Sequence, residues 1–89
     1  MTTFLKDPEA ELDYSVDWAK WLAAGETISS SSWDAPAGLN KVRTSFDNTG
    51  ATVFLGGGVP GETYRVTNSI VTSVDRKDSR SLTIKCVER

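Results

Sequence analysis

The stretch FLGGGVPGETYRVTNS, residues 54–69, decides the interpretation of the whole chain, because it gathers four of the seven glycines and one of the three prolines. In a two-layered β fold, a chain that passes from one sheet to the other turns a tight corner. Glycine permits the positive φ values and close backbone contacts needed there. Pro60 and Gly61 suit the central positions of a type II turn. Tyr64 follows, where a buried ring can send its hydroxyl back to the corner backbone. We therefore expect a structural corner made by Gly57, Pro60, Gly61 and Tyr64.

A phosphate-binding loop is the alternative use of these glycines, since glycine-rich turns expose amide groups to anions. Such a loop requires a Gly-Lys-Ser/Thr sequence and a following helix N-terminus. Neither is present, because the segment after the glycines alternates as a strand does. We interpret the glycines as architectural.

Alternation of apolar and polar residues predicts the strands. It is clearest at Leu12, Tyr14, Val16 and Trp18, which alternate with polar residues at the period of a strand with one exposed face. Further strand patterns include Val42, Thr44 and Phe46; Ala51, Val53 and Leu55; Tyr64, Val66 and Ile70; and Leu82, Ile84 and Cys86. Short strands separated by turns, without a long helix, indicate an all-β antiparallel sandwich of six to seven strands, of the immunoglobulin or fibronectin III type.

One segment has helical spacing instead. Trp18, Trp21 and Leu22 stand at i, i+3 and i+4, and Gly25 suits the position that follows a helix C-terminus. We expect one short helical turn near residues 18–24, which requires packing to be stable.

The N-terminus differs from the rest of the chain. Pro8 has no amide donor and pushes Asp7 toward extended geometry. We expect an extended arm over residues 1–10, which orders on a partner, and a single immunoglobulin-like domain over residues 11–89.

The serine-rich segment ETISSSSWD, residues 26–34, is interpreted as a strand of small residues, because Ile28 and Trp33 lie near its ends. These two residues have opposite parities in an alternating strand. Either a bulge brings both to one face or Trp33 points outward.

Composition restricts the possible functions. The 89 residues are 38% hydrophobic and 25% charged, as in a single globular domain with a thin core. No apolar run is long enough for a membrane span or a signal peptide. The chain has a single cysteine, Cys86, and no histidine, so disulfide, zinc and histidine-based chemistry are not expected, nor any other cofactor or metal. The net charge of −2 gives no case for nucleic acid.

Charge is nevertheless distributed unevenly along the chain. Residues 1–34 carry seven acids against two bases, a balance of −5, and residues 35–89 carry eight bases against five acids, a balance of +3. Glu11, Asp13 and Asp17 share the polar face of one strand, with i and i+2 carboxylates about 7 Å apart. That spacing suits a metal or a glycosidase pair, but a solvated or partner-facing strand is the commoner case.

Aromatic and basic residues supply the other candidates for contacts. Trp33 is either a core residue or, with Trp21, part of a sugar-binding platform. Phe54 lies on the face opposite to Val53 and Leu55, which makes it a candidate contact. Basic residues on the last two strands are solvated or face a partner. The candidate interface residues are Glu11, Asp13, Asp17, Trp33, Phe54, Arg65, Lys77 and Arg80.

Two long segments, KDPEAELDYSVDWAKWLAAGETISSSSW (6–33) and ATVFLGGGVPGETYRVTNSIVTSVDRKDSRSLTI (51–84), resemble the fibre-tail adaptor family of tailed-bacteriophage virion proteins. Residues Asp7-Pro8, Gly56-Gly57 with Gly61, and Arg80-Ser81-Leu82 are among the most specific. Gly58 and Val59 vary the corner relative to the family pattern. The resemblance implies an immunoglobulin-like fold and a non-enzymatic role that links tail or neck components to fibres, in a virion made in a bacterial cytoplasm.

Partners of this chain are therefore expected to be other virion proteins and further copies of itself, in a symmetric ring. In a head-to-tail ring, the acids Glu11, Asp13 and Asp17 of one copy would face bases such as Arg65, Lys77 or Arg80 of the next. A carbohydrate-binding module with an exposed Trp33, and a hydrolase using Glu11 and Asp13, are the alternatives.

Overall fold

The computed structural model describes residues 2–7 and 10–87. Within these residues the chain forms seven β-strands and no helix. The strands are β1 (Thr2–Lys6), β2 (Leu12–Asp17), β3 (Ile28–Asp34), β4 (Leu39–Phe46), β5 (Gly50–Gly57), β6 (Thr63–Thr72) and β7 (Lys77–Cys86). The all-β class predicted from alternation is therefore confirmed, and the number of strands reaches the upper end of the predicted range.

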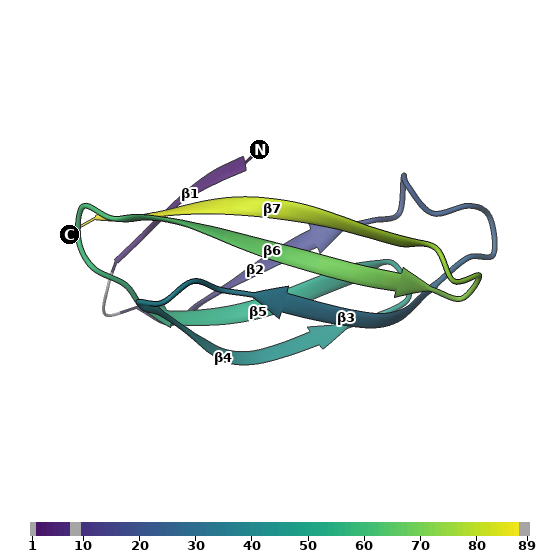
Figure 1. The fold of residues 1–89 in the computed structure, drawn as a ribbon, viewed down its shortest axis with the longest axis horizontal. Helices are drawn as coiled ribbons and strands as arrows, with labels where there is room; N and C mark the ends of the chain where they lie inside the picture. Colours follow the sequence, from purple (N-terminus) through teal and green to yellow (C-terminus); the bar gives the residue numbers. More distant parts are fainter. Residues whose placement is uncertain (1, 8–9, 88–89) are drawn as a thin grey trace.

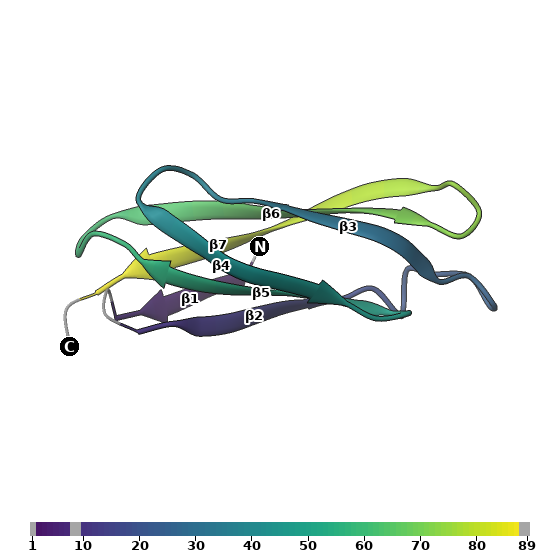
Figure 2. The same ribbon diagram turned by 90° about the horizontal axis from the view of Figure 1, so that it is seen from below.

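The strands form two stacked sheets (Figure 1, Figure 2). One has the order β1-β7-β6-β3 and the other the order β2-β5-β4. Paired strands run antiparallel, apart from β1 and β7, which run parallel with Thr2 opposite Leu82. The molecule measures 43 × 22 × 18 Å, so the sandwich has two well-separated ends. We call the end that holds the β5-β6 connection the corner end, and the end that holds the β6-β7 hairpin the hairpin end (Figure 1).

The core lies between the sheets and is built by the inward residues of alternating strands. Val53, Leu55, Val66 and Ile84 have no exposed surface. Burial of each such side chain contributes about 1.5 to 3 kcal/mol. Because side chains alternate along a strand, each sheet also presents a polar outer face.

Strand β3 contains a bulge between Ile28 and Ser30, where its register with β6 shifts. As a result Ile28 and Trp33 both lie in the core, 5% and 4% exposed. Of the two arrangements that their opposite parities left open, the structure has the bulge.

A buried amide holds this serine-rich strand in place. Asn68 on β6 is fully buried and accepts a hydrogen bond from Trp18 Nε1 at 3.0 Å. Its Nδ2 donates to Ser31 Oγ at 2.9 Å and to the Ser32 carbonyl at 3.0 Å. This network connects β3 to the segment that follows β2, and it satisfies polar groups whose burial would otherwise be costly.

The helical turn expected near residues 18–24 is a single hydrogen-bonded turn. The amides of Trp21 and Leu22 both donate to the Trp18 carbonyl, at 2.9 and 3.0 Å, and no helix continues from them. Trp21 packs edge-on against Trp18, with ring centroids 5.3 Å apart. Gly25 has a φ of +79°. A turn this short depends on the packing of its tryptophans, because one turn of helix is unstable alone.

At the corner between β5 and β6, Tyr64 is 7% exposed and its hydroxyl accepts a hydrogen bond from the Val59 amide at 3.0 Å. The Glu62 amide donates to the Val59 carbonyl at 3.0 Å, which closes a turn with Pro60 and Gly61 at its centre. Gly61 has a φ of +89°, the conformation that a type II turn requires at its third residue.

Three further glycines fit closely at or beside this corner. Gly38, Gly57 and Gly58 have φ values of +102°, +75° and +106°. A Cβ on Gly58 would overlap Cys86 Sγ, and a Cβ on Gly38 would lie 2.9 Å from the Tyr64 hydroxyl oxygen. These positions therefore need glycine for space as well as for conformation.

The N-terminal segment is part of the sandwich in this single chain, which corrects the expectation that it orders only on a partner. Strand β1 pairs with the C-terminal half of β7, and the Phe4 ring packs against Tyr14 at 5.1 Å. Lys6 is fully buried, and its Nζ donates to the carbonyls of Asp7 and Gly57 at 2.9 and 2.6 Å. The boundary between an arm of residues 1–10 and a domain of residues 11–89 stays a prediction, and residues 1, 8, 9, 88 and 89 lie outside the described part of the chain.

Candidate protein-interaction surfaces

The acid row, defined as Glu11, Asp13 and Asp17, lies on the outer face of the three-stranded sheet. All three residues are exposed, while Tyr14 and Val16 between them point into the core. The Asp17 carboxylate also accepts a hydrogen bond from the Ala19 amide at 2.9 Å. The row therefore presents negative charge along one edge of the sandwich.

Beside the acid row lies an aromatic contact. Phe54 on β5 is opposite Asp13 in the strand register and is half-buried. The guanidinium carbon of Arg43 lies 4.1 Å from the centre of its ring, a cation–π distance. Arg43 and its neighbour Val42 belong to β4, the strand at the other edge of this sheet, and Val42 is 48% exposed. The outer face of this sheet thus combines acids with a partly shielded aromatic ring.

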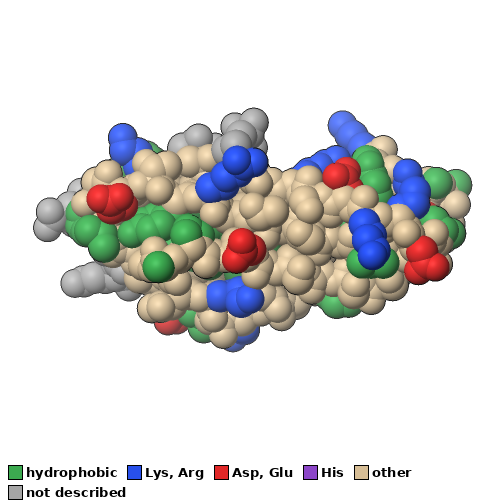
Figure 3. All heavy atoms as spheres, in the orientation of Figure 1, with side chains coloured by type: hydrophobic (Ala, Val, Ile, Leu, Met, Phe, Trp, Pro, Cys, Tyr) green, Lys and Arg blue, Asp and Glu red, His purple; other side chains and the backbone are tan. Residues whose placement is uncertain are grey.

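The outer face of the four-stranded sheet is different in composition. It carries the hydroxyl face, which we define as Ser30, Ser32, Thr67, Ser69, Ser79 and Ser81. Two cross-strand hydrogen bonds pair four of these six hydroxyls, Thr67 with Ser81 at 3.0 Å and Ser69 with Ser79 at 2.9 Å. In Figure 3, which views this face, the middle of the surface is mostly uncharged and not hydrophobic, and charged side chains are scattered around it.

Bases lie on the same side of the molecule as the hydroxyl face. Arg65 on β6 and Lys77 and Lys85 on β7 are exposed and have outward parity in their strands. A hollow of about 530 Å³ opens beside Val71 and Lys77 between β3 and β7. Another protein can cover the four paired hydroxyls of this face at a small desolvation cost, because they already bond each other.

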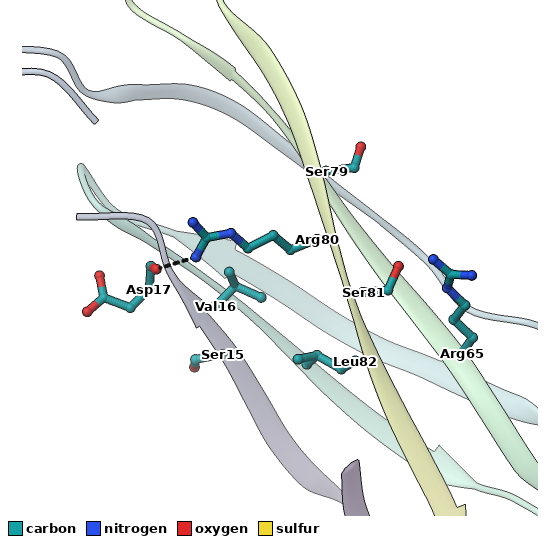
Figure 4. Close-up of a pocket in the computed structure, with 8 residues that line it drawn as sticks. All are labelled: Ser15, Val16, Asp17, Arg65, Ser79, Arg80, Ser81 and Leu82. Atoms are coloured by element: carbon teal, nitrogen blue, oxygen red, sulfur yellow. Dashed lines mark hydrogen bonds between the residues drawn. The ribbon is translucent and has the colours of Figure 1, made fainter. Parts of the chain in front are cut away.

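Arg80 does not point toward this outer face, although it was expected to contact a neighbouring copy. Its Nη1 donates to the Asp17 carbonyl at 3.1 Å, and its guanidinium carbon lies 4.4 Å from the centre of the Trp18 ring. Figure 4 shows the side chain reaching from β7 across to β2, with Val16 and Leu82 drawn below it. Arg80 therefore bridges the two sheets within its own chain.

Two other bases bridge the sheets in the same manner, and sequence reasoning missed both. Lys6 donates to the Gly57 carbonyl, as described above, and Lys41 Nζ on β4 donates to the Trp33 carbonyl on β3 at 2.9 Å. Each bond joins residues of different sheets. No local pattern signals such a contact, because only the packed sheets bring a side chain to a distant carbonyl.

Sequence reasoning also missed a charged cluster at the hairpin end. Glu26 is 6% exposed and pairs with Arg76 through Oε1 and Oε2, with Arg76 Nε at 2.9 Å from Oε2. Thr72 and the Ala23 amide also donate to this carboxylate. The hydrogen bonds from Arg76, Thr72 and Ala23 lower the pKa of Glu26 from 4.5 to about 2. Arg76 in turn covers the Trp21 ring at 4.2 Å.

The tryptophans do not form a sugar-binding platform in this structure. Trp33 and Trp18 are 4% and 0% exposed, and Trp21 lies partly buried beneath Arg76. A platform needs an open ring face, so the structure corrects the expectation that Trp33 could be exposed.

Among the residues that the structure describes, no group of three or more acidic, cysteine or histidine side chains is placed to hold a metal ion. None of the described residues belongs to a helix able to cross a membrane.

Comparison with known proteins identifies both a family and a fold. Residues 6–85 match the family model described as "Podophage GP4 fiber-tail adaptor protein gp77". Among solved structures, the chain is similar to the one titled "Solution structure of the PKD domain from KIAA 1837 protein", with a TM-score of 0.56 and 18% identity over 99% of this chain and 80% of that one. This similarity establishes an immunoglobulin-like fold and nothing about function. Among curated proteins, none matches the chain.

Proposed function

Since the chain belongs to the podophage fibre-tail adaptor family, we propose that it is a non-enzymatic structural adaptor that joins tail or neck components of a phage particle to fibres. In this role it resides in the tail region of the virion and acts through protein–protein contacts. Its partners are other virion proteins.

The observation that carries this proposal is the opposite net charge of the two outer faces. The acid row outweighs Arg43 on one face. Arg65, Lys77 and Lys85 outweigh Asp34 on the other. Complementary surfaces of this kind give specificity and register to an interface. A protein that must touch two neighbours at once needs two distinct surfaces, and the sandwich supplies them on opposite sides.

We extend the proposal to a head-to-tail ring, in which the acid row of one copy meets Arg65 and Lys77 of the next. A heterologous contact of this type closes into a ring when its rotation is suitable. Arg80 is omitted from this pairing, because its side chain extends toward β2 and not toward the outer face that carries Arg65 and Lys77.

A charge-reversal experiment tests the pairing. Glu11→Lys with Asp13→Lys should weaken self-association, measured by sedimentation, and reduce its sensitivity to salt. Glu62→Lys makes the same kind of charge change at an exposed position on the corner end and serves as the control. Combining the acid-row variant with Arg65→Glu and Lys77→Glu should restore association. Unchanged association and salt dependence in the acid-row variant would exclude the pairing.

Imaging of the particle tests the adaptor role itself. We expect density for this chain between tail and fibre components. Density at any other place, or absence of the chain from purified particles, would contradict the role whatever the outcome of the charge reversals.

A further inference from the structure

Among the described residues, half of β7 has no strand paired with its outer edge, and we call this part the bare edge. Strand β1 pairs with Leu82–Cys86, whereas β6 pairs with β7 along nearly its whole length, from Lys77 to Lys85. In the described sheet, Lys77–Ser81 therefore have a strand on one side and none on the other. Figure 1 shows β1 beside only the part of β7 nearest the corner end. An edge of this kind presents unpaired amides and carbonyls that can accept another strand.

A hollow of about 520 Å³ lies at this bare edge. Its lining comes from both sides of β7: Arg80 and Leu82 on the inward side, Ser79 and Ser81 on the outward side (Figure 4). Residues 15–17 of β2 form the opposite wall. A strand laid along an edge contacts both faces of the strand it joins, so the hollow has the position that an added strand would fill.

The charged side chains that line the hollow determine which side chain an incoming strand should carry. Arg80 and Arg65 line the hollow, one on each side of β7. A guanidinium has five N–H donors, and Arg80 uses Nη1 for the Asp17 carbonyl. The Asp17 carboxylate is turned to the Ala19 amide. A carboxylate on the incoming strand can therefore bond the guanidinium of Arg80 from the open side.

We propose that the bare edge of β7 at Lys77–Ser81 accepts an extended segment of a partner protein, with an acidic side chain next to Arg80. A segment of about five residues spans this edge at 3.3 Å per residue. The identification of the partner as a virion protein rests on the proposed function, but the strand-accepting edge does not.

In the absence of a partner, a side chain of β7 itself caps one backbone amide of the bare edge. The Ser79 amide donates to Asp78 Oδ1 at 2.8 Å, and both groups are exposed. A carbonyl from an incoming strand replaces this local bond at small cost. Capping of an edge by side chains is one means by which sheets avoid indiscriminate pairing.

A tethered strand tests the edge directly. Strand β1 runs parallel to β7 with Thr2 opposite Leu82. An extension added before Met1 that continued in this register would place its last residue, a glutamate, opposite Arg80. The extension is Met-Thr-Val-Thr-Glu, and the controls replace its glutamate by lysine or its valine by proline. Tethering supplies an effective concentration in the millimolar range.

Hydrogen exchange of the full chain is the readout. With the glutamate extension, amide exchange in residues 77–81 should slow by tenfold or more, while the lysine and proline extensions give smaller effects. Sedimentation verifies that each variant has the same state of association as the unextended chain, so that protection does not arise from additional copies. Equal exchange rates in the unextended chain and all three variants would overturn the proposal.

Exchange in the assembled particle tests the partner. The amides of residues 77–81 should exchange more slowly in purified particles than in the isolated chain. Equal rates in both, with the chain present in the particle, would overturn the proposed partner. Absence of the chain from particles would instead contradict the proposed function, and the tethered strand alone would then decide the edge.

Discussion

The two ends of the sandwich each bury a charged side chain, and they stabilise it by different means. At the corner end, Lys6 donates to backbone carbonyls, and the surrounding chain consists of closely packed glycines and Tyr64. At the hairpin end, Glu26 pairs with Arg76, whose guanidinium covers Trp21. The corner end therefore depends on backbone shape, and the hairpin end depends on side-chain charge.

This difference predicts different sensitivities. Contacts between glycine, backbone and a tyrosine hydroxyl depend on shape and hydrogen-bond geometry and not on a pair of charged side chains. A carboxylate–guanidinium pair loses its attraction when the acid is protonated. Substitutions that alter volume should thus act most strongly at the corner end, and changes of pH should act at the hairpin end.

The largest effect is expected from Gly58→Ala. The residue has a positive φ and its Cβ would overlap Cys86 Sγ. Backbone strain and overpacking together cost about 3 kcal/mol or more, against a total stability of about 5 to 13 kcal/mol for a domain of this size. Urea unfolding of the variant measures the loss.

Gly61→Ala is the matched control, because Gly61 also has a positive φ but nothing lies within 4 Å of its added Cβ. It should cost only the strain, about 1 to 2 kcal/mol. Adding Cys86→Ala to Gly58→Ala removes the overlapping sulfur and should recover part of the loss. Equal destabilisation by Gly58→Ala and Gly61→Ala would mean that close packing at the corner is not important.

Deletion of residues 1–6 examines whether β1 belongs to the corner end. It removes the pairing with β7, the Phe4 contact with Tyr14 and the buried Lys6. We expect a loss of about 2 kcal/mol, equivalent to a melting temperature about 10 °C lower. Leu5→Ser is the control, since Leu5 is 56% exposed and should change stability by less than about 0.5 kcal/mol. If the deletion left the free energy of unfolding unchanged, residues 1–6 would be an arm that does not contribute to the stability of the domain.

A smaller effect at the same end is expected from Tyr64→Phe. The substitution removes the oxygen that accepts the Val59 amide and leaves that amide unpaired, at a cost of about 1 to 2 kcal/mol. Tyr14→Phe is a close control: the Tyr14 hydroxyl is buried without a hydrogen-bond partner among the described residues, so its removal should be neutral or slightly stabilising. Thermal unfolding measures the stability of both variants. Equal losses of stability in Tyr64→Phe and Tyr14→Phe would contradict the role of the Tyr64 hydroxyl.

The sequence predicted those features of the fold that depend on local patterns. Alternation placed Tyr14, Val16, Val66 and Ile84 in the core, where the structure has them. The parities of Ile28 and Trp33 required either a bulge or an exposed tryptophan, but alternation could not select between them. The choice depends on Asn68, a residue 35 or more positions away in sequence that bonds the serine strand.

Features that depend on long-range packing were not predictable. No pattern in residues 1–10 indicates the parallel pairing of β1 with β7. The prediction of an extended arm there was based on Pro8. Arg80 resembled other exposed bases in the sequence, and its contact with Asp17 requires the two sheets to be assembled first. The hydroxyl face was a partial exception, because Thr67 and Ser69 on one strand and Ser79 and Ser81 on the next repeat at a period of two.

The smallest expected effect is the pH dependence at the hairpin end, because Arg76 is 46% exposed and solvent screens its pairing with Glu26. The folded-state pKa of Glu26 is about 2, below its ordinary value of 4.5. A lowered acid pKa contributes stability that is complete above about pH 5 and is lost as the pH falls toward about 2.

Glu26→Gln should therefore flatten the acid side of the stability–pH curve measured by urea unfolding. The lowered pKa of Asp47, caused by the amides of Thr49 and Gly50, adds a contribution of the same sign. The difference between wild type and Glu26→Gln isolates the Glu26 part, because Asp47 is present in both. Tyr64→Phe should shift the whole curve downward without changing its slope. If Glu26→Gln and Tyr64→Phe changed the curve in the same way, the two ends would not differ in what stabilises them, since the loss at the hairpin end would then be one of packing and not of charge.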